Sequence, residues 1–368
     1  METWRYIKEW DSLVSTAYGL SVDDTLPYSV HEENSPPILH LYRFKPSVIV
    51  GKYQDIKAAL KIDRCKERDI EYNRRSTGGG TVIMGEKTVA LGFGISMKHP
   101  KMKGGIRGVF DILGGVIINS LWKFGISASF RPKNDIEVNG KKIAGLSAST
   151  EVGDALLFHT SLLIDFDIPL MLDIMNTPAE KVYDKGYNCF SQRMTTMETE
   201  LGRKIEVEEV MKAVKESFEE TFEINFTEDQ LTHTEKGRVE WFIKKRYNCN
   251  EWIFSKRHPK FKMGEGLLKT PGGLLQVYMS LTGELIESLM ITGDFFSTSA
   301  DINKIESALK FVPADRKDIE STLSSLWSEN LIYGIDTSML TSAILKAKEN
   351  CRSGSRQDNV KYQSSNSK

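Results

Sequence analysis

The chain has 368 residues, enough for two domains with separate cores, and its 49 basic and 50 acidic residues give no broad positive field that would hold nucleic acid. Four widely spaced cysteines, Cys65, Cys189, Cys249 and Cys351, argue against a zinc site and against a secreted disulfide framework. No leader-like or membrane-spanning apolar run is present, so we expect a soluble cytoplasmic protein.

The first hundred residues alternate between strand and helix patterns. Residues 1–24 predict a strand and then a helix that carries Trp10, Leu13, Val14 and Ala17 on one face. Further strands are predicted at 38–44, 47–50 and 70–72, and a helical segment at 56–68. We expect residues 88–95 to be the antiparallel partner of 81–84, so that the two strands form a floor beneath a ligand.

A glycine-rich stretch lies between two of these strands: Arg74-Arg75-Ser76-Thr77-Gly78-Gly79-Gly80-Thr81-Val82. Glycines without Cβ atoms let backbone N–H groups approach a ligand closely, and the adjacent guanidinium groups suit a carboxylate or phosphate. A glycine-rich hairpin with solvated arginines gives the same pattern. For this stretch alone both interpretations stand.

A second stretch predicts a β-hairpin: Asn134-Asp135-Ile136-Glu137-Val138-Asn139-Gly140-Lys141-Lys142-Ile143-Ala144-Gly145. Asn139-Gly140 is the preferred two-residue turn between antiparallel strands. Strand alternation places Lys142 on the face opposite Lys141, so one lysine can point into a site while the other faces solvent. Edge-strand lysines that discourage aggregation are the other interpretation of this pair.

The remaining elements complete a first domain and begin a second. A helix is predicted at 108–124, where Gly114 and Gly115 each cost about 1 kcal/mol relative to alanine unless they pack tightly. His159 lies in an apolar strand at 156–165, where a histidine is commonly a core residue. An amphipathic helix at 207–222 closes the first domain. Strands at 267–280 and 284–292 and helices at 301–309 and 315–327 form a small α+β unit. We predict domains at 1–243 and 244–350, and a disordered polar tail at 351–368.

Together these residues resemble the lipoate–protein ligases of the biotin/lipoate ligase superfamily. The resemblance rests on Arg-Arg-x-Thr-Gly-Gly-Gly-x-Val, on Asn-Asp-Ile…Asn-Gly-Lys-Lys-Ile-Ala-Gly, on an entry strand at 46–54, and on His159-Thr160-Ser161-Leu162-Leu163. It implies an α+β fold: a catalytic domain of mixed β-sheets flanked by helices, and a small α+β C-terminal accessory domain. Met84-Gly85 departs from the family's usual His-Asp, which puts the details of substrate contact in question.

The resemblance also implies a chemistry. ATP activates lipoate or octanoate as an acyl-adenylate, pyrophosphate leaves, and a lysine of a lipoyl-carrier protein receives the acyl group. Lys142 would be the catalytic residue, Arg75 would lie beside phosphate or carboxylate, and Asp135 would bind Mg²⁺. The further residues expected to contact the nucleotide, the adenylate or the acyl chain are Thr77, Gly78, Gly79, Gly80, Thr81, Val82, Ile83, Asn134, Gly145 and His159.

The expected acceptor is an acyl-carrier domain of a 2-oxo acid dehydrogenase, the glycine-cleavage H protein or a dedicated lipoate-binding protein. We expect a monomer with no nucleic-acid or membrane partner, and a hinge between 227 and 248.

Three alternatives remain open. An octanoyltransferase of the same superfamily uses a cysteine just before the hairpin, where this chain has Lys133-Asn134-Asp135. A biotin–protein ligase has a Gly-Arg-Gly-Arg loop in place of Thr77-Gly78-Gly79-Gly80. A catalytically silent protein that binds a lipoyl adenylate is the alternative of another class.

Overall fold

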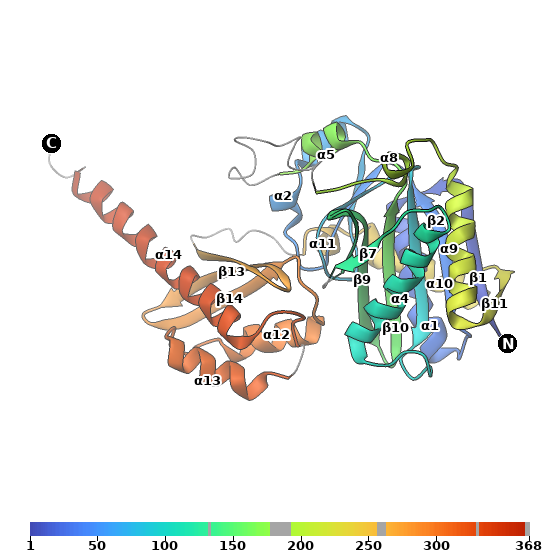
Figure 1. Ribbon diagram of the computed structural model, residues 1–368. Coiled ribbons are helices and arrows are strands. Elements are labelled where there is room, and N and C mark those ends of the chain that lie inside the picture. Colours follow the sequence, from blue (N-terminus) through green and yellow to red (C-terminus); the bar gives the residue numbers. More distant parts are fainter. Residues whose placement is uncertain (132–133, 177–192, 256–262, 329–330, 365–368) are drawn as a thin grey trace. The chain divides into compact units, whose positions relative to one another are not determined.

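The computed structural model describes residues 1–131, 134–176, 193–255, 263–328 and 331–364 (Figure 1), and it divides into two compact units. Unit 1 comprises Met1–Lys52, Ile56–Thr77 and Thr81–Ser255, so it continues past the predicted limit at 243. Unit 2 comprises Lys256–Lys368 together with two short pieces from earlier in the chain, Tyr53–Asp55 and Gly78–Gly80. Among the described helices, none has the length and apolar character needed to cross a membrane.

Unit 1 is built on two sheets. Its strands are β1 (Glu2–Val14), β2 (Ile38–Phe44), β3 (Ser47–Val50), β4 (Glu71–Arg74), β5 (Val82–Met84), β6 (Thr88–Ser96), β7 (Ser129–Arg131), β8 (Asp135–Val138), β9 (Lys141–Val152), β10 (Ala155–Leu163) and β11 (Ile224–Asp229). The larger sheet has the order β11-β1-β2-β6-β10-β9-β8-β7, and the smaller sheet has the order β4-β3-β5. In the larger sheet β1 is parallel to β11 and to β2, and the other neighbours are antiparallel.

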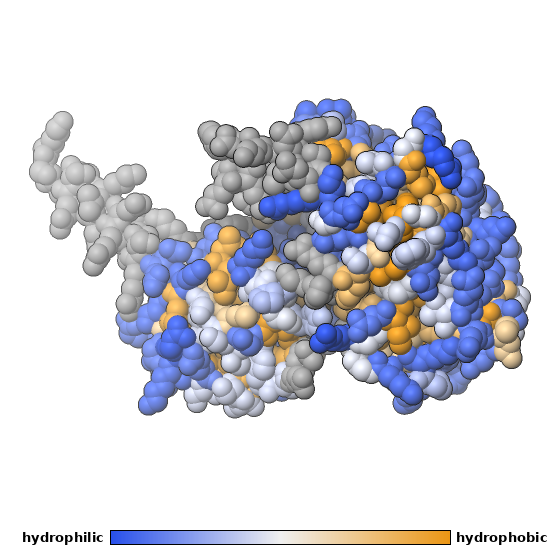
Figure 2. All heavy atoms as spheres, in the orientation of Figure 1, coloured by the Kyte–Doolittle hydropathy of each residue, from blue (hydrophilic) through white to orange (hydrophobic). Residues whose placement is uncertain are grey.

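Helices cover both faces of the larger sheet. The helices of unit 1 are α1 (Thr16–Glu32), α2 (Ile56–Ala59), α3 (Ile62–Glu67), α4 (Gly105–Trp122), α5 (Ile168–Ile174), α8 (Met197–Leu201), α9 (Val207–Phe222), α10 (His233–Phe242), the π-helix η1 (Ile243–Tyr247) and α11 (Asn250–Ile253). On one face α4 and α9 pack against a core that includes Trp4, Phe93 and Phe218. On the other face α1 and α10 pack over Ile7 and Ile38. The outer side of α9 is mostly hydrophilic (Figure 2), because its exposed positions carry residues such as Glu208 and Lys212.

Two predictions about the first hundred residues were wrong. β5 does not pair with β6: it pairs with β3 in the smaller sheet, and β6 lies between β2 and β10. The chain crosses from one sheet to the other after Met84, which packs with Tyr42 and Ala90 in a shared apolar cluster. In addition, β1 extends to Val14, so Trp10 lies in a strand, and α1 begins only after Ser15 caps it by accepting a hydrogen bond from the Tyr18 amide.

The predicted hairpin is confirmed. Asn139 and Gly140 adopt left-handed conformations, with φ of 52° and 76°, as a two-residue turn between β8 and β9 requires. In α4, a Cβ on Gly114 would lie 3.2 Å from both Leu146 and Phe130, whereas a Cβ on Gly115 would meet nothing within 4 Å. The expected tight packing therefore explains Gly114 and leaves Gly115 unexplained.

Unit 2 is a small α+β unit, as expected. Its strands β12 (Gly264–Thr270), β13 (Gly273–Thr282) and β14 (Leu285–Gly293) form an antiparallel meander. Its helices are α12 (Ser299–Ala308), α13 (Arg316–Leu326) and α14 (Thr337–Ser364). Val277, Ile305, Leu323 and Ile344 share its core. α14 continues to Ser364, across the segment expected to be disordered, because a polar run without proline can extend a helix already nucleated by packed residues such as Ile344.

Candidate active site

A mostly apolar pocket lies in unit 1, between β5, the β9–β10 pair and α5. Its lining consists of Thr81, Val82, Ile83, Lys142, Ala144, Gly145, Ser161, Leu163, Phe166, Met171, Met175 and Met194. Five residues singled out from the sequence therefore meet in one place: Thr81, Val82, Ile83, Lys142 and Gly145. Apolar walls with a single cationic group suit a hydrophobic chain that ends in an anion.

Lys142 is the charged group of this lining, and its main chain is fixed on both sides. Its N–H donates to the Arg193 carbonyl at 2.8 Å, and its carbonyl accepts from the Thr195 amide at 2.9 Å. Its Nζ lies 2.6 Å from Asp135 Oδ1, and both side chains remain about one-third exposed, at 32% and 27%. Gly145 leaves room for this side chain, because a Cβ there would lie 2.9 Å from Lys142 Nζ.

The side chains of Asn134 and Asp135 make different contacts. The Asn134 side-chain amide donates to the Leu146 carbonyl at 3.0 Å, and the Asn134 carbonyl accepts from the Leu146 amide at 2.8 Å. Asn134 thus ties the start of β8 to β9, while Asp135 faces Lys142. Among the described residues no three His, Cys, Asp or Glu side chains converge as a metal site. Asp135 offers a single carboxylate, which fits Mg²⁺ only when phosphate oxygens and water supply the other ligands.

The two arginines are both buried and differ in their contacts. Arg74 donates to the carbonyl oxygens of Gly51 and Lys52 at 3.0 and 2.8 Å, and to those of Trp252 and Ile253 at 3.1 Å. It fastens four backbone positions, which is a structural role. Arg75 is 7% exposed, and burial, assisted by the charge of Arg74, lowers its pKa to about 10. Arg75 therefore keeps its charge at neutral pH, and the described lining of the apolar pocket does not include it.

Thr77 and His159 contact each other beneath the glycine-rich stretch. The Thr77 hydroxyl lies 3.2 Å from His159 Nδ1, and the Thr77 carbonyl accepts from the Lys52 amide at 3.0 Å. Both side chains are buried, and neither belongs to the described lining of the pocket. The three glycines belong to unit 2, where Gly79 has a φ of 94° and its amide donates to the Phe295 carbonyl at 3.2 Å.

Two adjacent aspartates on α1 were missed from the sequence. Asp23 accepts hydrogen bonds from His40 and Tyr42 at 2.8 and 2.7 Å, and it lies 3.1 Å from His159 Nε2. Burial raises the pKa of Asp23, but the charges and hydrogen bonds of His159 and His40 outweigh burial and bring the pKa to about 2.

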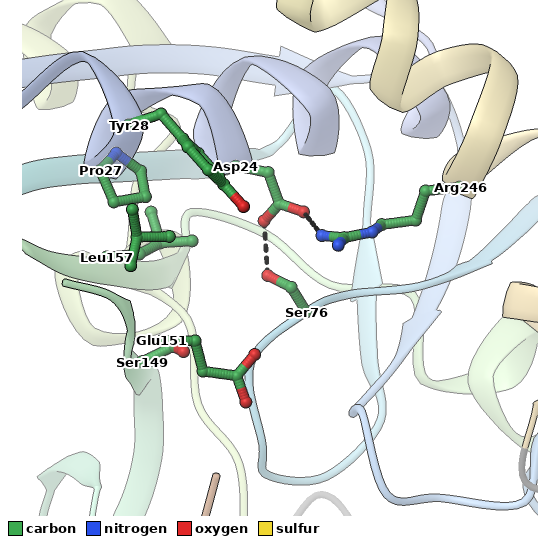
Figure 3. A pocket seen from close by; sticks show the side chains of 9 residues that line it. Asp24, Pro27, Tyr28, Ser76, Ser149, Glu151, Leu157 and Arg246 are labelled. Atoms are coloured by element: carbon green, nitrogen blue, oxygen red, sulfur yellow. Dashed lines mark hydrogen bonds and ion pairs between the residues drawn. The ribbon is translucent and has the colours of Figure 1, made fainter. Parts of the chain in front are cut away.

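Asp24, the second of this pair, has its own set of donors. It accepts from Ser76 and Arg246 at 2.5 Å, as Figure 3 shows, and from Tyr247 at 2.6 Å. Figure 3 also shows that Tyr28 and Leu157 line the small pocket beside this carboxylate. The one signal in the sequence was a pair of acidic residues in a helix whose other positions up to Val30 are uncharged.

None of the described cysteines belongs to the described lining of the apolar pocket, although Cys65 packs in the same apolar cluster as the lining residues Ile83 and Met175. Cys65 is fully buried in α3, and burial raises the pKa of its thiol. Cys351 belongs to unit 2, and burial raises the pKa of its thiol as well. Cys249 donates to the Glu251 carboxylate at 2.8 Å. Cys189 lies outside the described residues.

Comparison with known proteins places this site in a family. Residues 15–219 match the profile of the lipoyl protein ligase A/B catalytic domain, and residues 259–344 match that of the bacterial lipoate protein ligase C-terminus. The octanoyltransferase LipM of Halalkalibacterium halodurans is 27% identical over 280 residues, which cover 70% of this chain and 100% of that protein.

Two solved structures extend the comparison. A lipoate-protein ligase A bound with ATP is 25% identical, covers 69% of this chain and 99% of its own, and superposes with a TM-score of 0.59. LipL1 of P. falciparum in complex with lipoate shares the fold, with a TM-score of 0.74 at 20% identity over 94% of this chain and 99% of its own. With its catalytic-domain match spanning more than half of the sequence, this chain belongs to the lipoyl protein ligase A/B family, the enzymes that attach lipoyl or octanoyl groups.

Proposed function

We propose that this chain is an ATP-dependent lipoate–protein ligase. In the first step the carboxylate of lipoate or octanoate attacks the α-phosphorus of ATP, and pyrophosphate leaves. In the second step the amine of an acceptor lysine attacks the acyl carbonyl, an amide forms, and AMP leaves with the electron pair of the broken bond. The observation that carries this proposal is the apolar pocket whose cationic residue, Lys142, is paired with Asp135.

Lys142 is suited to both steps, because negative charge develops on the acyl oxygen and the α-phosphate. A fixed donor at such a position contributes about 2.7–4 kcal/mol in comparable sites. The backbone bonds to Arg193 and Thr195 supply the rigidity that this role requires. Asp135 would hold Mg²⁺, which would neutralise the charge of the departing pyrophosphate.

Octanoyl transfer without ATP is the second candidate, and the similarity to LipM favours it. That reaction needs a thiolate as acyl carrier, and a thiol becomes reactive when its pKa is lowered. In Cys65 and Cys351 burial acts in the opposite direction. Among the described residues, no cysteine stands beside Lys142 where a relay would be needed. These observations support the ligase over the transferase.

The acceptor is proposed from the family's chemistry. A lipoyl protein ligase acts on a protein, and we propose an acyl-carrier domain of a 2-oxo acid dehydrogenase, the H protein or a dedicated lipoate-binding protein. The relative LipM transfers octanoyl groups, so octanoate remains a proposed substrate beside lipoate. We further propose that the protein acts as a cytoplasmic monomer.

The test is pyrophosphate release by the purified full chain with ATP and Mg²⁺, with lipoate, octanoate and biotin supplied separately. Release with lipoate or octanoate is expected. Release with biotin alone moves the chain to the biotin ligases. Silence with all three acids, together with acyl transfer from an octanoylated carrier domain in the absence of ATP, establishes the transferase. Silence in both assays leaves the non-catalytic binding protein.

Two pairs of variants sharpen this test. Lys142→Ala is expected to lower pyrophosphate release about 10²–10³-fold with folding intact. Lys141→Ala changes the neighbouring lysine on the opposite strand face and is the matched control, expected to be near wild type. Cys189→Ser and Cys249→Ser retain full activity in a ligase. Loss of activity in either serine variant would refute the ligase in favour of a thiol relay.

A further inference from the structure

Unit 1 contains a cluster of buried polar residues centred on Asp23, called here the Asp23 network. It takes no part in the chemistry proposed for Lys142. His40 on β2, Gly92 on β6 and His159 on β10 are directly paired across three neighbouring strands. The Asp23 carboxylate lies over the middle position: a Cβ on Gly92 would be 2.0 Å from Asp23 Oδ1. Gly92 therefore provides a notch that seats one carboxylate between two histidines.

The partners of His40 fix its protonation. Its Nδ1 lies 2.8 Å from Asp23 Oδ1, and its Nε2 lies 3.0 Å from Glu9 Oε2. Because each ring nitrogen faces a carboxylate oxygen, each must carry a proton. Burial lowers the pKa of His40, but the hydrogen bonds to Asp23 and Glu9 outweigh burial and raise it, in agreement with this geometry.

The partners of His159 differ on its two sides. Its Nε2 lies 3.1 Å from Asp23 Oδ2, within ion-pair distance but outside hydrogen-bond geometry. Its Nδ1 lies within hydrogen-bond distance of the Thr77 hydroxyl, at 3.2 Å. Tyr42 donates to the same Asp23 oxygen at 2.7 Å, and the neighbouring Asp24 accepts from Ser76. Ser76 and Thr77, the two residues before Gly78, are thus held by contacts that lead back to α1. Asp24 contacts Ser76, and Asp23 contacts His159, which in turn contacts Thr77.

We propose that Asp23 is a positioning residue: seated over Gly92, it holds the His159 ring so that Nδ1 contacts the Thr77 hydroxyl, and Thr77 is thereby fixed at the start of the glycine-rich stretch for ATP. This inference rests on the proposed function where it names ATP. The hydrogen-bond arrangement itself does not depend on that function. The relay of contacts runs from Glu9 through His40, Asp23 and His159 to Thr77.

The first test observes the histidine rings of the wild-type protein directly. The chain has six histidines, and ¹⁵N-histidine labelling of the full protein at neutral pH resolves the tautomer of each ring. His159→Gln and His40→Gln assign the two signals. The inference expects a proton on His159 Nε2, the nitrogen that lies nearest the Asp23 carboxylate, and a doubly protonated His40. A His159 ring protonated on Nδ1 alone, or a neutral His40, would overturn it.

The second test separates positioning from general stability. Thr77→Val removes the hydroxyl and keeps the shape, while Thr77→Ser retains the hydroxyl. We expect Thr77→Val to lower kcat/KM for ATP in lipoate-dependent pyrophosphate release by about tenfold, the worth of one hydrogen bond. The dissociation constant for lipoate should stay unchanged, because Thr77 is outside the pocket lining. Equal activity of the valine and serine variants would refute the relay.

Asp23→Asn tests the centre of the network, and Asp229→Asn is its matched control. Asp229 on β11 forms an ion pair with Arg5 at 2.6 Å, far along the sheet from β6 and β10. Asp23→Asn should change the ¹⁵N signals of the His159 ring and lower kcat/KM for ATP, and Asp229→Asn should do neither. If the wild-type protein releases no pyrophosphate, the proposed function is refuted. The relay is not refuted by that result, because the tautomer measurement tests it independently.

Discussion

Replacing Gly92 with alanine tests the notch under Asp23 by adding one methyl group. The new Cβ would lie 2.0 Å from Asp23 Oδ1 and 2.4 Å from its Cγ, well inside the roughly 3.5 Å of a relaxed contact. Either β6 and α1 move apart, or the carboxylate leaves His40, Tyr42 and His159. Overpacking costs about 1–3 kcal/mol, and separating a buried ion pair costs about 3–5 kcal/mol. We therefore expect the free energy of unfolding to fall by about 3 kcal/mol.

Urea denaturation measures this loss as a lower midpoint at an unchanged slope. Of the six tryptophans only Trp327 lies in unit 2, so fluorescence in a Trp327→Phe background reports unit 1. The decisive comparison is the double variant Gly92→Ala/Asp23→Ala, which removes the atoms that the methyl group meets. There Gly92→Ala should cost less than about 1 kcal/mol, so the coupling is about 2 kcal/mol. If the unfolding free-energy costs of Gly92→Ala and Asp23→Ala add up to that of the double variant within about 0.5 kcal/mol, the notch is refuted.

Three further outcomes follow from the same contacts. Gly115→Ala should stabilise unit 1 by about 0.5–1 kcal/mol in the same urea assay, because its Cβ meets nothing, and Gly114→Ala should gain less, because its Cβ crowds Leu146. Gly145→Ala should displace Lys142 Nζ and lower pyrophosphate release by up to about 10²-fold at unchanged urea midpoint. Asp23 has a folded pKa of about 2 against an ordinary value of 3.8, so its stabilisation is present above pH 4 and is lost between about pH 4 and 2; Asp23→Asn should flatten that acid limb of urea midpoint against pH.

The sequence predicted those parts of the site whose conformation is local. The Asn139-Gly140 turn specifies the β8–β9 hairpin by its own backbone preference, and the hairpin carries Lys142 and Gly145 to the pocket. The periodicity of residues 207–222 likewise predicted α9 with its bounds. In both cases a short segment contains the information that fixes its structure.

The missed features depend on partners far along the chain. Asp23 and Asp24 resemble solvated helix positions until His40, His159 and Arg246 are brought to them by other elements. The pairing of β5 with β3 rather than β6 is decided by packing between two sheets, which alternation within a strand does not reveal. Phe166 and Met171 line the pocket from the residues before α5 and from α5 itself. They lie far from Lys142 in the sequence, and the periodicity of one segment does not show which distant segment it will contact.

The parallel pairing of β1 has a consequence for how the protein is made. Glu2 is joined to Ile224, so β1 obtains its outer neighbour only after synthesis has passed Ile224. Until then the edge of β1 from Glu2 to Ile7 is open, and an open edge is a template for association with other chains. Contacts of such sequence separation also slow folding. Unit 1 therefore closes late, and chains that stop short of β11 should aggregate rather than accumulate as a stable fragment.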